Sequence, residues 1–157
     1  MNHALQLRKE GRLKESNERL LMLVKVAPED PQLNYQVAWS FDVLGLESEA
    51  APFYEKAIEL GLQNEDLEGA LLGLGSTYRT LGEYEKSETT LSKGIELFPE
   101  NHAIKAFYAM VLYNLDRHQE AMEILLKGLT ETSSDTSIQR YKRAIEFYAD
   151  KLDETWK

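Results

Sequence analysis

The stretch Leu71-Leu-Gly-Leu-Gly75-Ser-Thr-Tyr78-Arg-Thr-Leu-Gly82-Glu-Tyr-Glu-Lys-Ser87 decides the fold, because it joins two helix-forming segments through a glycine. Gly82 permits the positive φ that ends one helix, and the apolar spacing resumes directly after it. Gly75 and Ser87 are small, so two antiparallel helices can approach each other closely there, with larger side chains around the crossing. The stretch therefore predicts a helical hairpin.

The same arrangement recurs along the chain. Each of four turn residues is followed five positions later by serine or alanine, giving the pairs Gly11 and Ser16, Gly45 and Ala50, Gly82 and Ser87, and Asp116 and Ala121. Successive turn residues are 34, 37 and 34 positions apart. This period, with a three-residue insertion between the second and third units, is typical of stacked helical hairpins.

The third unit carries a family resemblance. Leu71-x-x-Leu74-Gly75-x-x-Tyr78 resembles the W-x-x-L-G-x-x-Y pattern of the tetratricopeptide repeat family, with Leu71 in place of tryptophan. The resemblance implies an all-α fold, a right-handed superhelical array of antiparallel helix pairs with a C-terminal capping helix. We expect a single domain over 1–157, with units at about 1–30 (truncated), 31–64, 68–101 and 102–135, and a capping helix over about 136–157.

Several local features depart from a regular repeat. Pro52 predicts that its helix begins at Ser48 as N-cap or is kinked, and residues 62–67 are expected to form a longer loop around the insertion. Lys105 stands where a large apolar residue is usual, so loose packing is expected beside it. After Asp135, a predicted N-cap, an apolar stripe is expected to face the array and consists of Ile138, Tyr141, Ile145, Tyr148, Leu152 and Trp156.

Composition narrows the class of protein. The chain has 157 residues, no cysteine, and 27 acidic against 18 basic side chains, for a formal charge of −9. Neither disulfides nor thiolate metal sites are available, and the negative field disfavours nucleic acid and membrane surfaces as partners. With no apolar leader at residues 1–10, we expect a cytoplasmic protein.

The sequence contains no recognisable group of catalytic residues. His3, His102 and His118 fall at unrelated places in the repeat and form no metal-binding pair. Gly69, Gly73 and Gly75 follow no strand, so a phosphate-binding loop is not indicated. We therefore expect no cofactor, no metal and no enzymatic activity, and an enzyme or part of one is the least favoured hypothesis.

The predicted function is to bind a protein or peptide partner. In the family that the chain resembles, the first helix of each unit lines a concave surface. Projecting the helical period from the core positions Val37, Leu74 and Tyr108 places a set of aromatic, sulfur-containing and polar side chains on that surface. The candidate binding residues are Tyr35, Gln36, Trp39, Asp42, Ser76, Arg79, Met110 and Tyr113, with Arg8 and Leu5 extending one end and Arg140 the other.

Two alternatives stay open. Tyr35 and Trp39 could pack against neighbouring units instead of binding a partner. The truncated first unit could also leave Leu5, Leu7 and Leu20 poorly covered, which would favour a homodimer that buries them.

Overall fold

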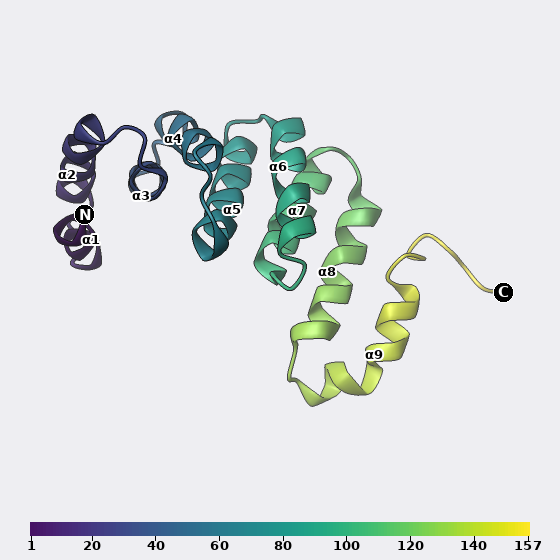
Figure 1. The fold of residues 1–157 in the computed structure, drawn as a ribbon. Helices are drawn as coiled ribbons and strands as arrows, with labels where there is room; N and C mark the ends of the chain where they lie inside the picture. Colours follow the sequence, from purple (N-terminus) through teal and green to yellow (C-terminus); the bar gives the residue numbers. More distant parts are fainter. The chain divides into compact units, whose positions relative to one another are not determined.

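The computed structural model describes residues 1–157 and contains nine α-helices and no strand (Figure 1). The helices are α1 (Asn2–Lys9), α2 (Leu13–Val26), α3 (Pro31–Asp42), α4 (Glu47–Glu59), α5 (Asn64–Thr80), α6 (Tyr84–Leu97), α7 (His102–Asn114), α8 (His118–Thr132) and α9 (Thr136–Tyr148). The predicted all-α array of helix pairs is confirmed. None of these helices combines the length and apolar character needed to cross a membrane.

The helices group into two compact units, Met1–Thr90 and Leu91–Lys157, and each is described by itself. Helix α6 begins in the first unit and ends in the second. In the first unit, each of the helices α1 to α4 packs against the next one along the chain. In the second, α7 packs on α8 and α8 on α9. That the whole chain forms a single domain stays a prediction.

The predicted turn residues end the first helix of each pair. Gly11, Gly45 and Gly82 have φ values of 79°, 70° and 78°, and Asp116 adopts φ 59° at the equivalent position. After every one of them, the next N–H donates to a carbonyl five residues earlier, as in Glu83 N to Tyr78 O at 2.9 Å. This is the bond that closes a left-handed helix end, and it satisfies a carbonyl that the helix leaves unpaired.

The small residues of the repeat lie at the predicted helix crossings. Ser16 Oγ donates to the Ala4 carbonyl at 2.7 Å, and Ser87 Oγ donates to the Gly75 carbonyl at 2.6 Å. Both hydroxyls are fully buried and both bonds span 12 residues. The predicted register of the repeat is therefore correct in the first and third units.

The inserted residues lengthen a helix, so the prediction of a longer loop at 62–67 was wrong. Helix α5 begins at Asn64 and has 17 residues, against 12 in α3 and 13 in α7. Leu62 is buried and anchors the connection, while Glu65 and Asp66 lie in the first turn, where acidic side chains stabilise the helix dipole.

Helix α4 also begins earlier than predicted. Its N-cap is Leu46, so Ser48 is the second helical residue, and Pro52 lies within the helix. The Leu46 N–H bonds to the Phe41 carbonyl at the end of α3, and its carbonyl accepts from Ala50 N at 3.0 Å. The turn thus fixes the start of α4 immediately after Leu46, and the backbone bond missing at Pro52 is tolerated inside the helix.

The first unit is better covered than the sequence suggested. Leu7 is 5% exposed and Leu20 is fully buried, and Leu20 packs with Ala4, Val24, Leu33 and Val37. The short helix α1 is therefore long enough to cover α2. The expectation that Leu7 and Leu20 form an exposed apolar face was wrong.

The final helix differs from its prediction in length and in rotation. Asp135 is its N-cap, as predicted, accepting from Ser137 N and Ile138 N, but α9 ends at Tyr148 instead of near 157. Polar side chains bond α9 to α8: Thr130 Oγ1 donates to Glu146 Oε1 and Gln139 Nε2 donates to the Thr130 carbonyl, each at 3.0 Å. Tyr141 and Tyr148 of the predicted apolar stripe are 61% and 47% exposed, so the stripe lies partly in solvent.

Candidate functional site

The predicted binding residues lie on first helices of the hairpins in both units. Helix α3 carries Tyr35, Gln36, Trp39 and Asp42, helix α5 carries Ser76 and Arg79, and helix α7 of the second unit carries Met110 and Tyr113. The structure brings the α3 residues together with α1 and α5. Here the Trp39 face means Arg8, Gln36, Trp39, Ser76 and Arg79.

Trp39 is held between two neighbours and keeps an exposed part. Arg8 places its guanidinium carbon 3.9 Å from the centroid of the Trp39 ring, and Tyr35 stacks beside that ring at 6.1 Å and 27°. Trp39 remains 41% exposed, whereas Tyr35 is only 9% exposed. Tyr35 therefore supports Trp39 from within, and Trp39 presents the aromatic surface.

Arg8 connects α1 to α3. Its Nη2 donates to Gln36 Oε1 at 2.6 Å, while its Nη1 is buried without a hydrogen-bond partner. Burial lowers the pKa of Arg8, yet an arginine stays charged at neutral pH because its ordinary pKa is so high. The site thus contains a fixed positive charge against an indole, a favourable cation–π geometry.

Asp42 joins three helices. Its carboxylate accepts a bond from Tyr54 Oη of α4 at 2.7 Å and one from Thr77 Oγ1 of α5 at 2.9 Å. Burial raises the pKa of Asp42, and the two hydrogen bonds oppose that shift. Burial next to the Asp42 carboxylate likewise raises the pKa of Tyr54. Asp42 therefore links α3, α4 and α5 next to Trp39. The helical period alone did not predict this structural role.

Two glycines of α5 make room for the aromatic side chains under the site. A Cβ at Gly69 would lie 2.2 Å from Tyr35 Oη, and one at Gly73 would lie 2.6 Å from both Cζ and Oη of Tyr54. Sequence reasoning excluded a phosphate loop at these glycines but assigned packing to Gly75 alone. Gly69 and Gly73 are one helical turn apart and therefore lie on the same side of α5, and this spacing could have indicated their packing role.

A pocket opens beside Trp39. It has a volume of about 260 Å³ and is lined by Trp39, Asp42, Val43, Glu47, Ser76, Thr77 and Thr80. Its walls combine an indole edge with hydroxyl and carboxylate groups. Such a pocket can receive one side chain of a bound segment while the hydroxyls orient its polar atoms.

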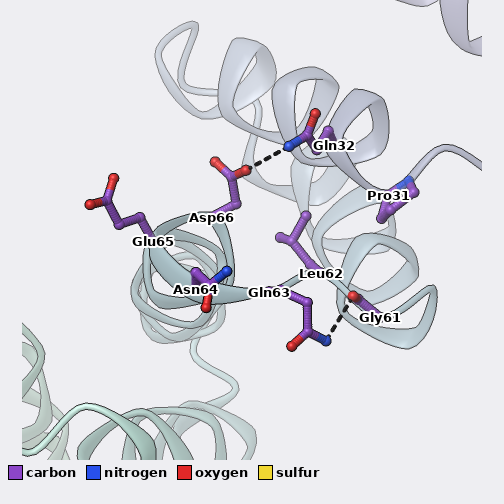
Figure 2. A pocket seen from close by; sticks show the side chains of 8 residues that line it. All are labelled: Pro31, Gln32, Gly61, Leu62, Gln63, Asn64, Glu65 and Asp66. Carbon is purple, nitrogen blue, oxygen red and sulfur yellow. Dashed lines mark hydrogen bonds between the residues drawn. The ribbon is translucent and has the colours of Figure 1, made fainter.

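A larger pocket of about 490 Å³ lies at the N-terminal end of α3 (Figure 2). Gln32 Nε2 donates to Asp66 Oδ2 at 3.1 Å across it, and Gln63 Nε2 donates to the Gly61 carbonyl at 3.0 Å. Figure 2 shows the Gln32 and Asp66 side chains pointing toward one another from α3 and α5. Its lining comes from the start of α3, the start of α5 and the connection before α5.

In the second unit, α7 presents two of the predicted residues to solvent. Met110 is 41% exposed and Tyr113 is 63% exposed, with the Tyr113 ring centroid 4.7 Å from that of His118. A separate pocket of about 290 Å³ lies beside Lys105, whose Nζ is 3.9 Å from Glu131 Oε2. The loose packing expected at Lys105 stays a prediction.

Comparison with known proteins finds a relative by sequence and several similar solved structures. The chain is 28% identical over 108 residues, 64% of its length, to Superkiller protein 3 of Saccharomyces cerevisiae, and the match spans 7% of that protein's length. Among solved structures, MamA matches with a TM-score of 0.78 at 16% identity, covering 95% of this chain and 89% of that one. YrrB matches with a TM-score of 0.75 at 19% identity, covering 98% and 77%.

At these identities the solved structures show a shared fold, and the family is shown by a match to a family model. The model of the tetratrico peptide repeat matches residues 31–152 of the chain. This range begins with α3 and includes all the later helices. The chain therefore belongs to the tetratrico peptide repeat family.

Proposed function

We propose that the chain is a protein-interaction module, and that a peptide or protein segment of a partner lies across the Trp39 face. The observation that carries the proposal is Trp39 itself: this residue is 41% exposed although Arg8 and Tyr35 hold its ring in place. A large aromatic ring that is fixed and still exposed loses little conformational entropy on binding. Tryptophan and arginine are also among the side chains enriched at binding hot spots.

Each of the other residues has a proposed part. Gln36 and Ser76 flank the indole with polar atoms, and Arg79 supplies a second guanidinium on α5 for acidic or carbonyl groups of the partner. Tyr35 stacks beside Trp39 and holds its ring, and Asp42 holds the pocket wall through its bond from Thr77. Met110 and Tyr113 offer further contacts on the second unit, where both are exposed.

The comparisons lend support of a general kind. YrrB is described as a tetratricopeptide protein with an unusual peptide-binding site, and it shares the fold of this chain at 19% identity. We propose by analogy that this chain also acts by binding and has no catalytic activity of its own. The alternative of a self-associating scaffold predicts a dimer in solution, which light scattering would detect.

The proposal is tested by capturing partners on immobilised wild-type protein and on a Trp39→Ala variant from the same lysate, with proteins quantified by mass spectrometry. A partner that uses the Trp39 face should be recovered on the wild type and depleted at least several-fold on the variant. Met22→Ala is the matched control, because Met22 is 62% exposed on α2 and lies outside the face. Equal recovery on all three proteins would contradict the proposal.

A further inference from the structure

The outer side of α9 is an uncovered aromatic surface. No residue of α9 is buried, and Tyr141, Phe147 and Tyr148 are 61%, 52% and 47% exposed. Trp156, which follows the helix, is 58% exposed. Monomeric proteins rarely leave such side chains together in solvent without a binding role.

The aromatic rings support one another. Ring centroids of Phe147 and Tyr148 are 5.1 Å apart, those of Tyr148 and Trp156 are 5.4 Å apart, and those of Phe147 and Trp156 are 6.1 Å apart. The Lys151 ammonium lies 4.8 Å from the Phe147 centroid. The three rings form a cluster that is already ordered, so a partner would meet an assembled surface.

Unpaired positive charge lies on the same helix. Lys142 pairs with Glu146 at 3.7 Å, but the exposed Arg140 and Arg143 form neither a hydrogen bond nor an ion pair. Elsewhere in the chain, Arg12 pairs with Glu15 and is satisfied locally. Two free guanidinium groups one helical turn apart are therefore a distinct feature of α9 in a chain of net charge −9.

We propose that this α9 face, consisting of Arg140, Tyr141, Arg143, Phe147, Tyr148 and Trp156, docks an acidic amphipathic helix of a partner protein. A helix laid along α9 can place apolar anchors one and two turns apart against the aromatic rings. Carboxylates on its flank then meet Arg140 and Arg143 in charge-assisted bonds. The inference is independent of the Trp39 face, because all these residues belong to the second unit.

Charge selects this occupant over others. Two copies of the chain, each with a net charge of −9, repel one another at low salt, which disfavours a second copy as the occupant. Recruitment to anionic lipid takes roughly four to eight clustered basic residues. Helix α9 has three basic side chains and one acidic one, and Lys142 is already paired with that acidic residue. The two free arginines are enough to pair with the carboxylates of an acidic protein helix.

The test uses the whole 157-residue chain and two synthetic, fluorescein-labelled amphipathic helical peptides that share one apolar stripe. One peptide carries glutamates beside the stripe and the other carries lysines at the same positions, and binding is followed by fluorescence anisotropy. We expect the glutamate peptide to bind at least tenfold more tightly than the lysine peptide. The double variant Arg140→Glu, Arg143→Glu should reverse that preference, and Tyr148→Ser should weaken binding of the glutamate peptide severalfold.

Controls separate docking from unfolding. Both sets of changes are at exposed positions, so far-ultraviolet circular dichroism and the melting temperature should stay at wild-type values. Arg19→Glu, on the exposed side of α2, should leave peptide affinity unchanged. Equal affinity for the two peptides would overturn the inference. So would tighter binding to vesicles containing phosphatidylserine than to the glutamate peptide, or self-association in light scattering that the double variant abolishes.

Discussion

Thr77 of α5 donates a hydrogen bond to Asp42 of α3 over 2.9 Å, joining residues 35 positions apart in the chain. Thr77 is 1% exposed, and Asp42 is half-buried beneath Trp39 in the pocket wall. With the bond from Tyr54, this contact fixes α3, α4 and α5 together below the Trp39 face. The proposed binding surface therefore rests on an internal polar network whose loss can be measured.

The first prediction concerns pH and Asp42. Because burial raises its pKa in the folded state, the folded protein binds this proton more tightly than the unfolded chain. The contribution of Asp42 to the unfolding free energy should therefore fall as pH rises from the ordinary aspartate pKa through the raised one. Asp42→Asn cannot titrate, so its stability relative to wild type should improve across that interval.

Urea unfolding of both proteins between about pH 3 and pH 7 measures the difference directly. If wild type instead gained stability relative to Asp42→Asn as pH rises, the two hydrogen bonds would lower the pKa of Asp42 by more than burial raises it. The same series should show Asp42→Ala to be less stable by about 1 to 3 kcal/mol at neutral pH, because buried hydroxyls would lose their acceptor.

The second prediction concerns the glycines of α5. Gly73→Ala should destabilise the protein by about 1 to 3 kcal/mol, although alanine is the better helix former, since its Cβ would lie 2.6 Å from Tyr54. Gly128→Ala is the matched change, because a Cβ there meets nothing within 4 Å. It should stabilise by up to about 1 kcal/mol. Thermal unfolding checks both, and a stabilised Gly73→Ala would disprove the close approach of α4 and α5.

Much of the fold follows from the sequence because its signals are local. Gly82 and Asp116 terminate helices through their own backbone conformation, and Ser87 contacts a carbonyl only 12 residues away. These features repeat with the period of the chain, so the helix pairs and their register could be predicted. The family resemblance identified at Leu71 to Tyr78 agrees with the family match over residues 31–152.

The remaining features depend on contacts that the period does not contain. Leu62 is buried just before the extended helix α5. Helix α9 is bonded to α8 where Gln139 donates to the Thr130 carbonyl and Thr130 donates to Glu146. From the sequence, Arg8 could be assigned to one end of the predicted concave binding surface. Its position over the Trp39 ring could not be predicted, because it requires the geometry of two helices from different hairpins.

The third prediction concerns the support of Trp39 by Arg8. The chain has two tryptophans, so a Trp156→Phe background leaves Trp39 as the only indole reporter. Arg8→Ala should shift its emission to longer wavelength, because the ring face now covered by the guanidinium becomes hydrated. The cost in stability should be about 1 kcal/mol or less, the usual range for a partly exposed cation–π pair.

Arg8→Lys provides the control for charge alone. Lysine keeps the positive charge but lacks the planar group that stacks on the indole and donates to Gln36, so its emission should lie between those of wild type and Arg8→Ala. Identical spectra for all three proteins would mean that Arg8 does not cover Trp39 in solution.

The central claim is that a partner binds at the Trp39 face, and titration calorimetry of a captured partner segment against wild type and Trp39→Ala tests it most directly. We predict that the variant binds about 1 to 3 kcal/mol more weakly while losing no more than about 1 kcal/mol of unfolding free energy. Met22→Ala, outside the face, should match wild type in both measurements. Unchanged affinity of Trp39→Ala, with the fold intact, would contradict the claim.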